Sequence, residues 1–374
     1  MRISNSLYFV LIFILLSSTS YAASCTDLKQ QAEKGNAGAQ FQLGLSYHSG
    51  ACGPVDYNEA FKWFKKSAEQ GNAAGQNALG ILYAHSNGVE QNFATAADWY
   101  RKSAENGYAS GQGNYAEVLL LGQGIEQDKQ EALKWCRKSV AQDSSKGQFI
   151  MGYMYEFGSG VPQDYAQAIK WYSKSARQDD MDAMYRLATL YMNGKGVSRN
   201  LLEATKWYEK AAIEGQPQAQ YELGEMYKDG IGVPQNYAEA AKLFKASASN
   251  GNIRSCYYLG AMYEYGQGVP ENHAESIRYY TIAANNGDSE SQCCLGSIYL
   301  SSDNFKEAYK WFKISADHGN VRAQYNLGVM FLKGDGVKQD LKEGERLLRL
   351  AAEHGDETAQ KILKKKNFAR HNKI

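Results

Sequence analysis

The sequence has little proline, no excess of one charge and, beyond its first residues, no long hydrophobic run. It contains 5 prolines against 36 glycines among 374 residues, which indicates many turns. Arg2 is the only charged residue among the first 22, and the rest carries 40 Lys and Arg against 40 Asp and Glu. Because the charges balance, no net electrostatic attraction to nucleic acid or to an anionic membrane is expected. The apolar run at 7–16 is shorter than the roughly 20 residues of a membrane-spanning helix, so we predict no membrane span.

Motifs that would indicate catalysis are missing as well. The six histidines show no His-Glu-x-x-His pattern, and no two of them stand at i, i+4. Neither a Gly-x-Ser-x-Gly elbow nor a Ser-x-x-Lys sequence is present. Recurrent Gly-x-Gly-Val segments lack the lysine and hydroxyl of a phosphate-binding Walker loop. We therefore expect no enzymatic activity, no metal and no cofactor.

The first 22 residues are typical of a secretory signal peptide. A basic Arg2 precedes the apolar run, and residues 20–22 (Ser-Tyr-Ala) form a small-x-small cleavage site. We predict cleavage after Ala22 and a periplasmic or secreted protein. Residues 22–25 (Ala-Ala-Ser-Cys) only faintly resemble a lipoprotein cleavage site, because Ala22 stands where a larger aliphatic residue is usual. Simple secretion is therefore favoured over lipidation.

The rest of the chain repeats itself every 36 residues. A Leu-Gly dipeptide recurs at multiples of this spacing, and its last copy follows after 32 residues: Leu43-Gly44, Leu79-Gly80, Leu223-Gly224, Leu259-Gly260, Leu295-Gly296 and Leu327-Gly328. With this four-residue deletion allowed for, all six tryptophans share one repeat position: Trp63, Trp99, Trp135, Trp171, Trp207 and Trp311. We predict nine repeats over 39–358, starting at 39, 75, 111, 147, 183, 219, 255, 291 and 323.

Each repeat is predicted to be a pair of amphipathic helices, most clearly over 219–229 and 237–250. Apolar residues of the first stretch stand at i, i+4, i+7 and i+8, which is one helix face: Ala219, Leu223, Met226 and Tyr227. Neither helix can bury this face alone, so the pairs must stack. The second glycine of the connecting Gly-x-Gly-Val turn is expected to need positive φ, and the glycine inside the first helix to allow close helix approach. Asp or Asn followed three residues later by Glu predicts a capping box on the second helix.

Incomplete repeats flank the array. Residues 23–38 are predicted to form an N-terminal capping helix, and residues 359–374 a C-terminal capping helix with a solvated basic tail. The eighth repeat has lost its four residues from the turn, so its helices should be intact. We predict a disulfide between Cys25 and Cys52, because both lie at the same end of adjacent helices. Cys256 could pair with Cys293 or Cys294, whereas Cys136 is predicted to be a small core residue.

The recurrent Leu-Gly-x-x-Tyr, Gly-x-Gly-Val and Trp-Tyr-x-Lys-x-Ala segments resemble the Sel1-like repeat family. Close matches are residues 221–224, 232–233 and 207–212, and the resemblance spans 39–358. It implies an all-α, right-handed superhelical solenoid of nine 36-residue helix-turn-helix repeats, similar to tetratricopeptide arrays. It also implies an adaptor or receptor role, which in exported bacterial members is linked to envelope assembly or host interaction. Cysteine-rich relatives linked to β-lactam binding carry a cysteine pair in every repeat, a pattern that is absent here.

The resemblance also implies that the first helices line the inner curve of the solenoid. Aromatic residues recur at their third position, roughly opposite the predicted core face: Phe41, Phe149, Tyr185, Tyr221, Tyr257 and Tyr325. This series either packs between repeats, which we favour, or binds a partner together with Tyr153. Partner choice should follow aromatic residues that vary between repeats, namely Phe157, Tyr258 and Tyr265.

These patterns favour a scaffold that binds a protein partner. Its targets could be a host glycoprotein, peptidoglycan or an envelope assembly factor, and the oligomeric state is left open. One alternative is a hydrolase acting on the cell wall or on β-lactams through a site without a known motif. Another is an adaptor of a eukaryotic secretory lumen, which ranks last because the sequence ends Asn372-Lys373-Ile374 without an ER-retention signal.

Overall fold

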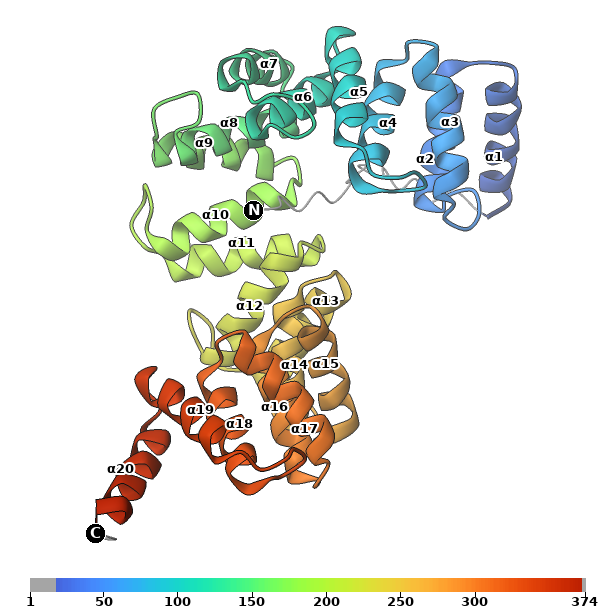
Figure 1. The fold of residues 1–374 in the computed structure, drawn as a ribbon. Coiled ribbons are helices and arrows are strands. Elements are labelled where there is room, and N and C mark those ends of the chain that lie inside the picture. The colour runs from blue at the N-terminus through green and yellow to red at the C-terminus, as the bar shows by residue number, and fades with distance from the viewer. Residues whose placement is uncertain (1–17, 372–374) are drawn as a thin grey trace. The chain divides into compact units, whose positions relative to one another are not determined.

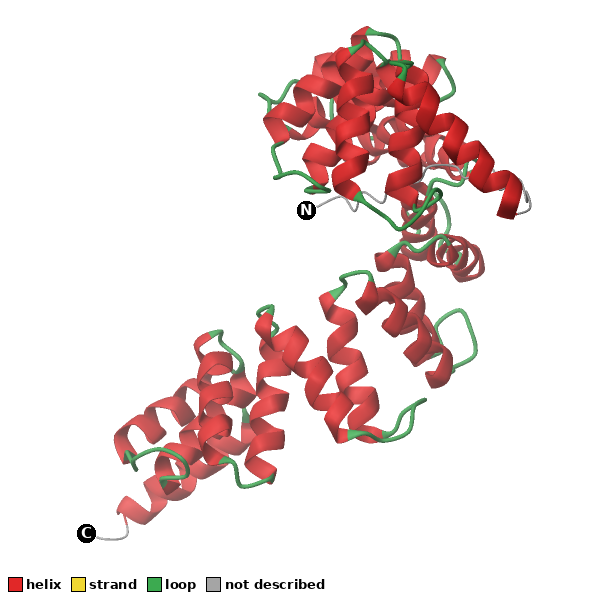
Figure 2. Cartoon of the chain, turned by 90° about the vertical axis from the view of Figure 1, so that its right-hand side faces the viewer, coloured by secondary structure: helices red, strands yellow, loops and turns green. Residues whose placement is uncertain are grey.

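The computed structural model describes the backbone of residues 18–371 and the side chains of residues 25–364. This part of the chain forms twenty α-helices and no strand, which confirms the all-α prediction (Figure 2). The predicted signal peptide lies outside the described residues except for 18–22, whose backbone belongs to α1 (Ser18–Glu33). None of the described helices is long and apolar enough to cross a membrane.

The chain divides into two compact units, Met1–Glu214 and Gly215–Ile374 (Figure 1). Unit 1 contains α1 and the pairs that follow it: α2 (Ala37–Ser49), α3 (Tyr57–Glu69), α4 (Ala73–His85), α5 (Phe93–Glu105), α6 (Ala109–Leu121), α7 (Lys129–Ala141), α8 (Ser145–Phe157), α9 (Tyr165–Ala176), α10 (Met181–Asn193) and α11 (Leu201–Ile213). Unit 2 contains α12 (Pro217–Asp229), α13 (Tyr237–Ser249), α14 (Ile253–Tyr265), α15 (His273–Asn285), α16 (Ser289–Ser301), α17 (Phe305–Asp317), α18 (Val321–Lys333), α19 (Leu341–Glu353) and α20 (Glu357–His371).

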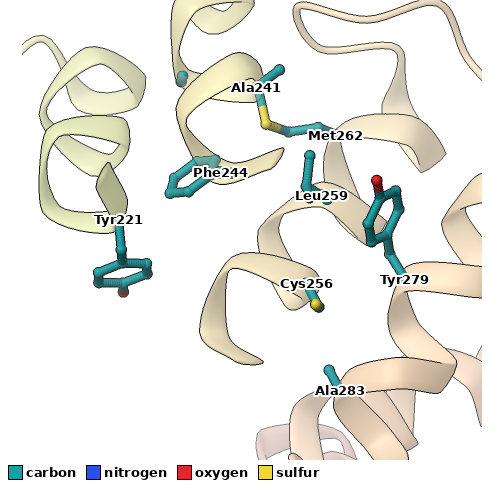
Figure 3. Packing of buried hydrophobic residues seen from close by; sticks show 9 residues of the cluster. Tyr221, Ala241, Phe244, Cys256, Leu259, Met262, Tyr279 and Ala283 are labelled. Atoms are coloured by element: carbon teal, nitrogen blue, oxygen red, sulfur yellow. The ribbon is translucent and has the colours of Figure 1, made fainter. Parts of the chain in front are cut away.

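Each repeat is one helix pair whose first helix begins two residues before the repeat start assigned from the sequence, at Ala37 in the first repeat. The first helix packs most extensively against the second helix of its own pair, and within each unit the second helix packs against the next first helix. In unit 2, Leu259 and Met262 of α14 lie between Phe244 of α13 and Tyr279 of α15 (Figure 3). The apolar stripes are thus buried by stacking, as their spacing predicts.

The turn between the helices has the predicted backbone conformation. After α12, Gly230 ends the helix at φ 69° and Gly232 follows at φ 74°. Equivalent second glycines of the other intact turns also have positive φ. The glycine inside the first helix allows close approach, as expected: a Cβ on Gly260 would lie 2.6 Å from Cδ1 of Tyr280.

The predicted capping box forms only in part. The Asn236 side chain accepts from the backbone N–H of Glu239 at 3.1 Å, which satisfies one open donor of α13. The N–H of Asn236 does not need the Glu239 side chain, because it donates to the carbonyl of Tyr227 in α12 at 2.8 Å. Glu239 instead pairs with Lys242 at 2.9 Å. The second helix is therefore tied to the first helix at its start.

The structure agrees with the sequence-based predictions for the cysteines and the eighth repeat, with one exception. Cys25 of α1 and Cys52, in the turn after α2, form a disulfide with Cα atoms 5.8 Å apart. The suggested pairing of Cys256 with Cys293 or Cys294 is wrong, because all three are free thiols, and buried Cys136 is also free. In the eighth repeat α16 and α17 keep 13 residues each, and only residues 302–304 separate them.

Candidate functional site

The recurrent aromatic residues of the first helices are core contacts rather than a free surface. Phe149 and Tyr221 are buried, and the other four members of the series are half-buried. The Phe149 ring lies 5.7 Å from that of Tyr172, in the second helix of the same repeat, and Phe41, Tyr185, Tyr221 and Tyr257 make equivalent contacts. The series thus makes packing contacts, the alternative that we favoured, although the partner ring belongs to the same repeat rather than to a neighbouring one.

Two of the variable aromatic residues are exposed, one in each unit. Phe157 ends α8 with 41% of its surface exposed, and Tyr265 ends α14 with 65% exposed. The Tyr153 ring lies 4.5 Å from the Phe157 ring, one helical turn away. Arg186 of α10 covers both rings, with its Cζ 5.8 Å and 5.5 Å from their centroids. We call Tyr153, Phe157 and Arg186 the Phe157 cluster.

The positive charge of Arg186 in the Phe157 cluster is paired with a buried carboxylate, Glu156. Glu156 is buried, lies 3.8 Å from Arg186 through Oε1, and accepts a hydrogen bond of 2.7 Å from the Tyr172 hydroxyl through Oε2. Burial and the Glu156 carboxylate together raise the pKa of Tyr172, so this hydroxyl remains a donor. The guanidinium is thereby held over the rings, where a cation is attracted by their faces.

A second aromatic group lies in unit 2 around Tyr258 of α14. Its hydroxyl donates to Glu225 Oε1 of α12 at 2.8 Å, and its ring stacks on Phe244 with centroids 5.0 Å apart. Lys228 Nζ lies 5.2 Å from the same ring. Burial, followed by the bond to Glu225, raises the pKa of Tyr258 to about 12, so the phenol is neutral. Tyr258 is therefore half-buried and held on both faces, unlike Phe157.

Sequence reasoning missed the most exposed of the large apolar residues that the structure describes. Ile213 is 82% exposed and lines a pocket of about 330 Å³ with Trp207, Lys210 and Met184. A signal was available, since every other repeat places a polar residue or alanine here: Glu69, Glu105, Ala141, Arg177, Ser249, Asn285, Asp317 and Glu353. In contrast, no set of three metal-binding side chains occurs among the residues that the structure describes.

Nine consecutive segments of the chain match the Sel1 repeat family: 37–72, 73–108, 109–144, 145–180, 182–216, 217–252, 253–288, 290–320 and 321–356. The chain belongs to the Sel1 repeat family. Proteins built from Sel1 repeats generally mediate protein–protein interaction, and their scaffold is typically non-enzymatic.

Solved structures of Sel1 repeat proteins are similar to this chain. A Sel1 repeat protein from Oxalobacter formigenes is 29% identical with a TM-score of 0.54, over 81% of this chain and 89% of that one. The protein c5321, described as a protective antigen present in uropathogenic Escherichia coli strains, is 35% identical with a TM-score of 0.46, over 90% of this chain and 80% of that one. A comparison with curated proteins found no match.

Proposed function

We propose that this Sel1 repeat protein is an exported scaffold that binds a protein partner through its first helices, with the Phe157 cluster as the anchor. The observation that carries the proposal is the exposed ring of Phe157, which packs against half-buried Tyr153 and lies under Arg186, whose charge is paired with buried Glu156. Aromatic and arginine side chains supply most of the binding energy at protein interfaces. Because Arg186 is fixed by Glu156, the cluster would lose little conformational freedom on binding.

Phe157→Ala tests the anchor, and Phe93→Ala is its matched control. Phe93 opens α5 in the same unit and is 39% exposed, but it lies on a second helix. The wild-type chain and both variants would be used for affinity capture from envelope extract of the native cells and from host glycoproteins. We expect the captured partner to bind Phe157→Ala about 30-fold more weakly, the loss of a contact worth about 2 kcal/mol, and Phe93→Ala unchanged.

If both variants bind the partner equally weakly, binding does not depend specifically on the first helices. If both variants bind it as tightly as the wild-type chain does, Phe157 is not part of the interface. Circular dichroism and thermal melting of the variants would separate loss of binding from loss of fold. Capture of a glycan or of peptidoglycan in place of a protein would contradict the proposed partner class.

Export is the second part of the proposal. The disulfide between Cys25 and Cys52 supports it, because such bonds persist in oxidising compartments. The signal-like residues 1–22 support it independently. Mass spectrometry of the protein from fractionated cells should find a chain that begins at Ala23 outside the cytoplasm. An intact N-terminus, or recovery from the cytoplasm alone, would overturn this part and leave the interaction surface to be judged separately.

A further inference from the structure

Two adjacent thiols in unit 2 contact one guanidinium. Cys293 and Cys294 lie in α16, and Arg322 is the second residue of α18. Arg322 Nε lies 3.2 Å from the Cys293 sulfur and Nη2 lies 3.4 Å from the Cys294 sulfur. Cys293 is buried and Cys294 is half-buried. The outer side of Arg322 lines a pocket of about 430 Å³ that also includes Ser289 and His318.

In two other repeats, a basic residue at this place acts on a carboxylate of the preceding first helix. Lys146, the second residue of α8, lies 2.8 Å from buried Glu117 of the preceding first helix. Arg254, the second residue of α14, similarly acts on half-buried Glu222 of α12. A basic residue here thus faces an anion on the preceding first helix. At Arg322 that anion is replaced by the two thiols, and the nearest carboxylate is exposed Glu290 at 3.9 Å.

We propose that Cys293 and Cys294 form a binding site for a soft monovalent metal ion, Cu(I), with Arg322 as the counter-ion. Thiolate ligands select soft ions such as Cu(I). Structural zinc requires four ligands, whereas no third histidine, cysteine or carboxylate completes a set of three among the described residues. A dithiolate with Cu(I) carries one negative charge, which the adjacent guanidinium neutralises. This charge balance suits a largely buried site.

Binding exchanges protons for the metal without oxidation or reduction. Each thiol forms one sulfur–copper bond and releases its proton to solvent, so two protons leave per ion. Burial raises the pKa of both thiols, that of Cys294 to about 11, and Arg322 opposes the rise.

Anaerobic titration with Cu(I), in competition with a chromophoric Cu(I) chelator, tests the site. Ascorbate would keep the copper reduced and leave the Cys25–Cys52 disulfide intact. We expect one tightly bound ion per chain and two protons released. Cys294→Ser should abolish this uptake, and Cys256→Ser, which alters a buried thiol outside the site, should retain it.

Arg322→Ala keeps both thiols and should weaken binding about 10- to 100-fold, the usual effect of a residue that supports the metal ligands, while Arg322→Lys should restore part of the affinity. X-ray absorption of the loaded protein should show two sulfur ligands. Wild-type uptake equal to that of Cys294→Ser would overturn the proposal, as would one released proton or full affinity in Arg322→Ala. Because Arg322 variants retain the cysteines, these outcomes do not depend on how serine is tolerated.

Discussion

Two kinds of glycine share one backbone conformation in this protein but differ in their surroundings. Gly268, in the turn between α14 and α15, has φ +72°, and a Cβ there would lie 2.2 Å from the backbone carbonyl of Tyr237. Gly287, between repeats, has φ +89°, and a Cβ there would meet nothing within 4 Å. The sequence itself reflects this difference, since Asp143 and Asp179 take the place of Gly287 at positive φ. Only the turn glycine requires both the conformation and the space.

Gly268→Ala should therefore destabilise unit 2 more than Gly287→Ala. Both changes incur the positive-φ penalty of roughly 1–2 kcal/mol, and Gly268→Ala must also displace rigid backbone, at roughly 1–3 kcal/mol more. Urea denaturation followed by circular dichroism would measure the two free energies of unfolding. Equal losses would mean that the turn can move away from Tyr237, and that conformation alone explains its glycine.

Single residues were predictable where one physical demand decides them. The turn glycines and the helix N-caps belong to this class. Each of these residues is determined by the local backbone, either by its positive φ or by the open N–H groups at the start of a helix. The aromatic series headed by Phe41 lies opposite the apolar stripe on a helical wheel and yet packs, because a wheel with one core face does not describe a first helix. Within a unit, such a helix contacts its own second helix and the second helix of the preceding pair, so it is covered on more than one side. Exposure at Phe157 depends on which neighbours are long enough to cover it.

At the scale of helices, polar side chains join neighbouring helices in a regular way. The Ser247 hydroxyl of α13 donates to the carbonyl of Pro217, the first residue of α12 in the same repeat, at 2.6 Å. Five other serines make the equivalent bond: Ser67, Ser103, Ser139, Ser175 and Ser315. Gln292 Nε2 donates to the carbonyl of Ala284 at 3.0 Å, while its Oε1 lies 3.0 Å from His318 Nδ1. The glutamine at this repeat position thus links consecutive repeats. The sequence shows the recurrence of these residues but not their partners, because the partners lie in other helices.

Helix α1 is held in place by a disulfide bond, unlike the helices of the repeats. α1 precedes the nine repeats, and the Cys25–Cys52 bond closes a loop with a sequence separation of 27. In the chain-entropy description, a loop of this size stabilises the folded state by roughly 3 kcal/mol. Reduction, or Cys25→Ser with Cys52→Ser, should raise hydrogen exchange in α1 and in the turn after α2, but leave α4 onward protected.

Hydrogen exchange with mass spectrometry, with and without reductant, would measure this effect segment by segment. Cys136→Ser provides the control, because Cys136 is a free buried thiol within the array and is unaffected by reductant. Exchange that rises evenly throughout unit 1 after reduction would show that α1 is an integral part of the array rather than a separately held cap.

For the molecule as a whole, repetition is what the sequence predicts best. The 36-residue period gave the helix pairs, their number and the shortened eighth turn, because every repeat meets the same neighbours and so preserves the same residues. The two proposed sites depend on departures from that average. Phe157 and the Cys293–Cys294 pair each occupy positions that other repeats fill with different residues. The repeat pattern does not show which of these atypical residues contact one another in the folded protein.

Stability should also be distributed along the array rather than shared by one core. Leu223 of α12 and Leu187 of α10 occupy the same repeat position, are both buried, and belong to different units. Either Leu→Ala change should cost roughly 2–5 kcal/mol locally. Because repeat arrays are held by contacts between neighbours, each change should open mainly its own unit and broaden the melting transition. Hydrogen exchange should then rise in α12–α19 for Leu223→Ala and in α2–α11 for Leu187→Ala. The same loss of protection in both variants, with one sharp transition, would instead mean that the two units unfold as a single cooperative body.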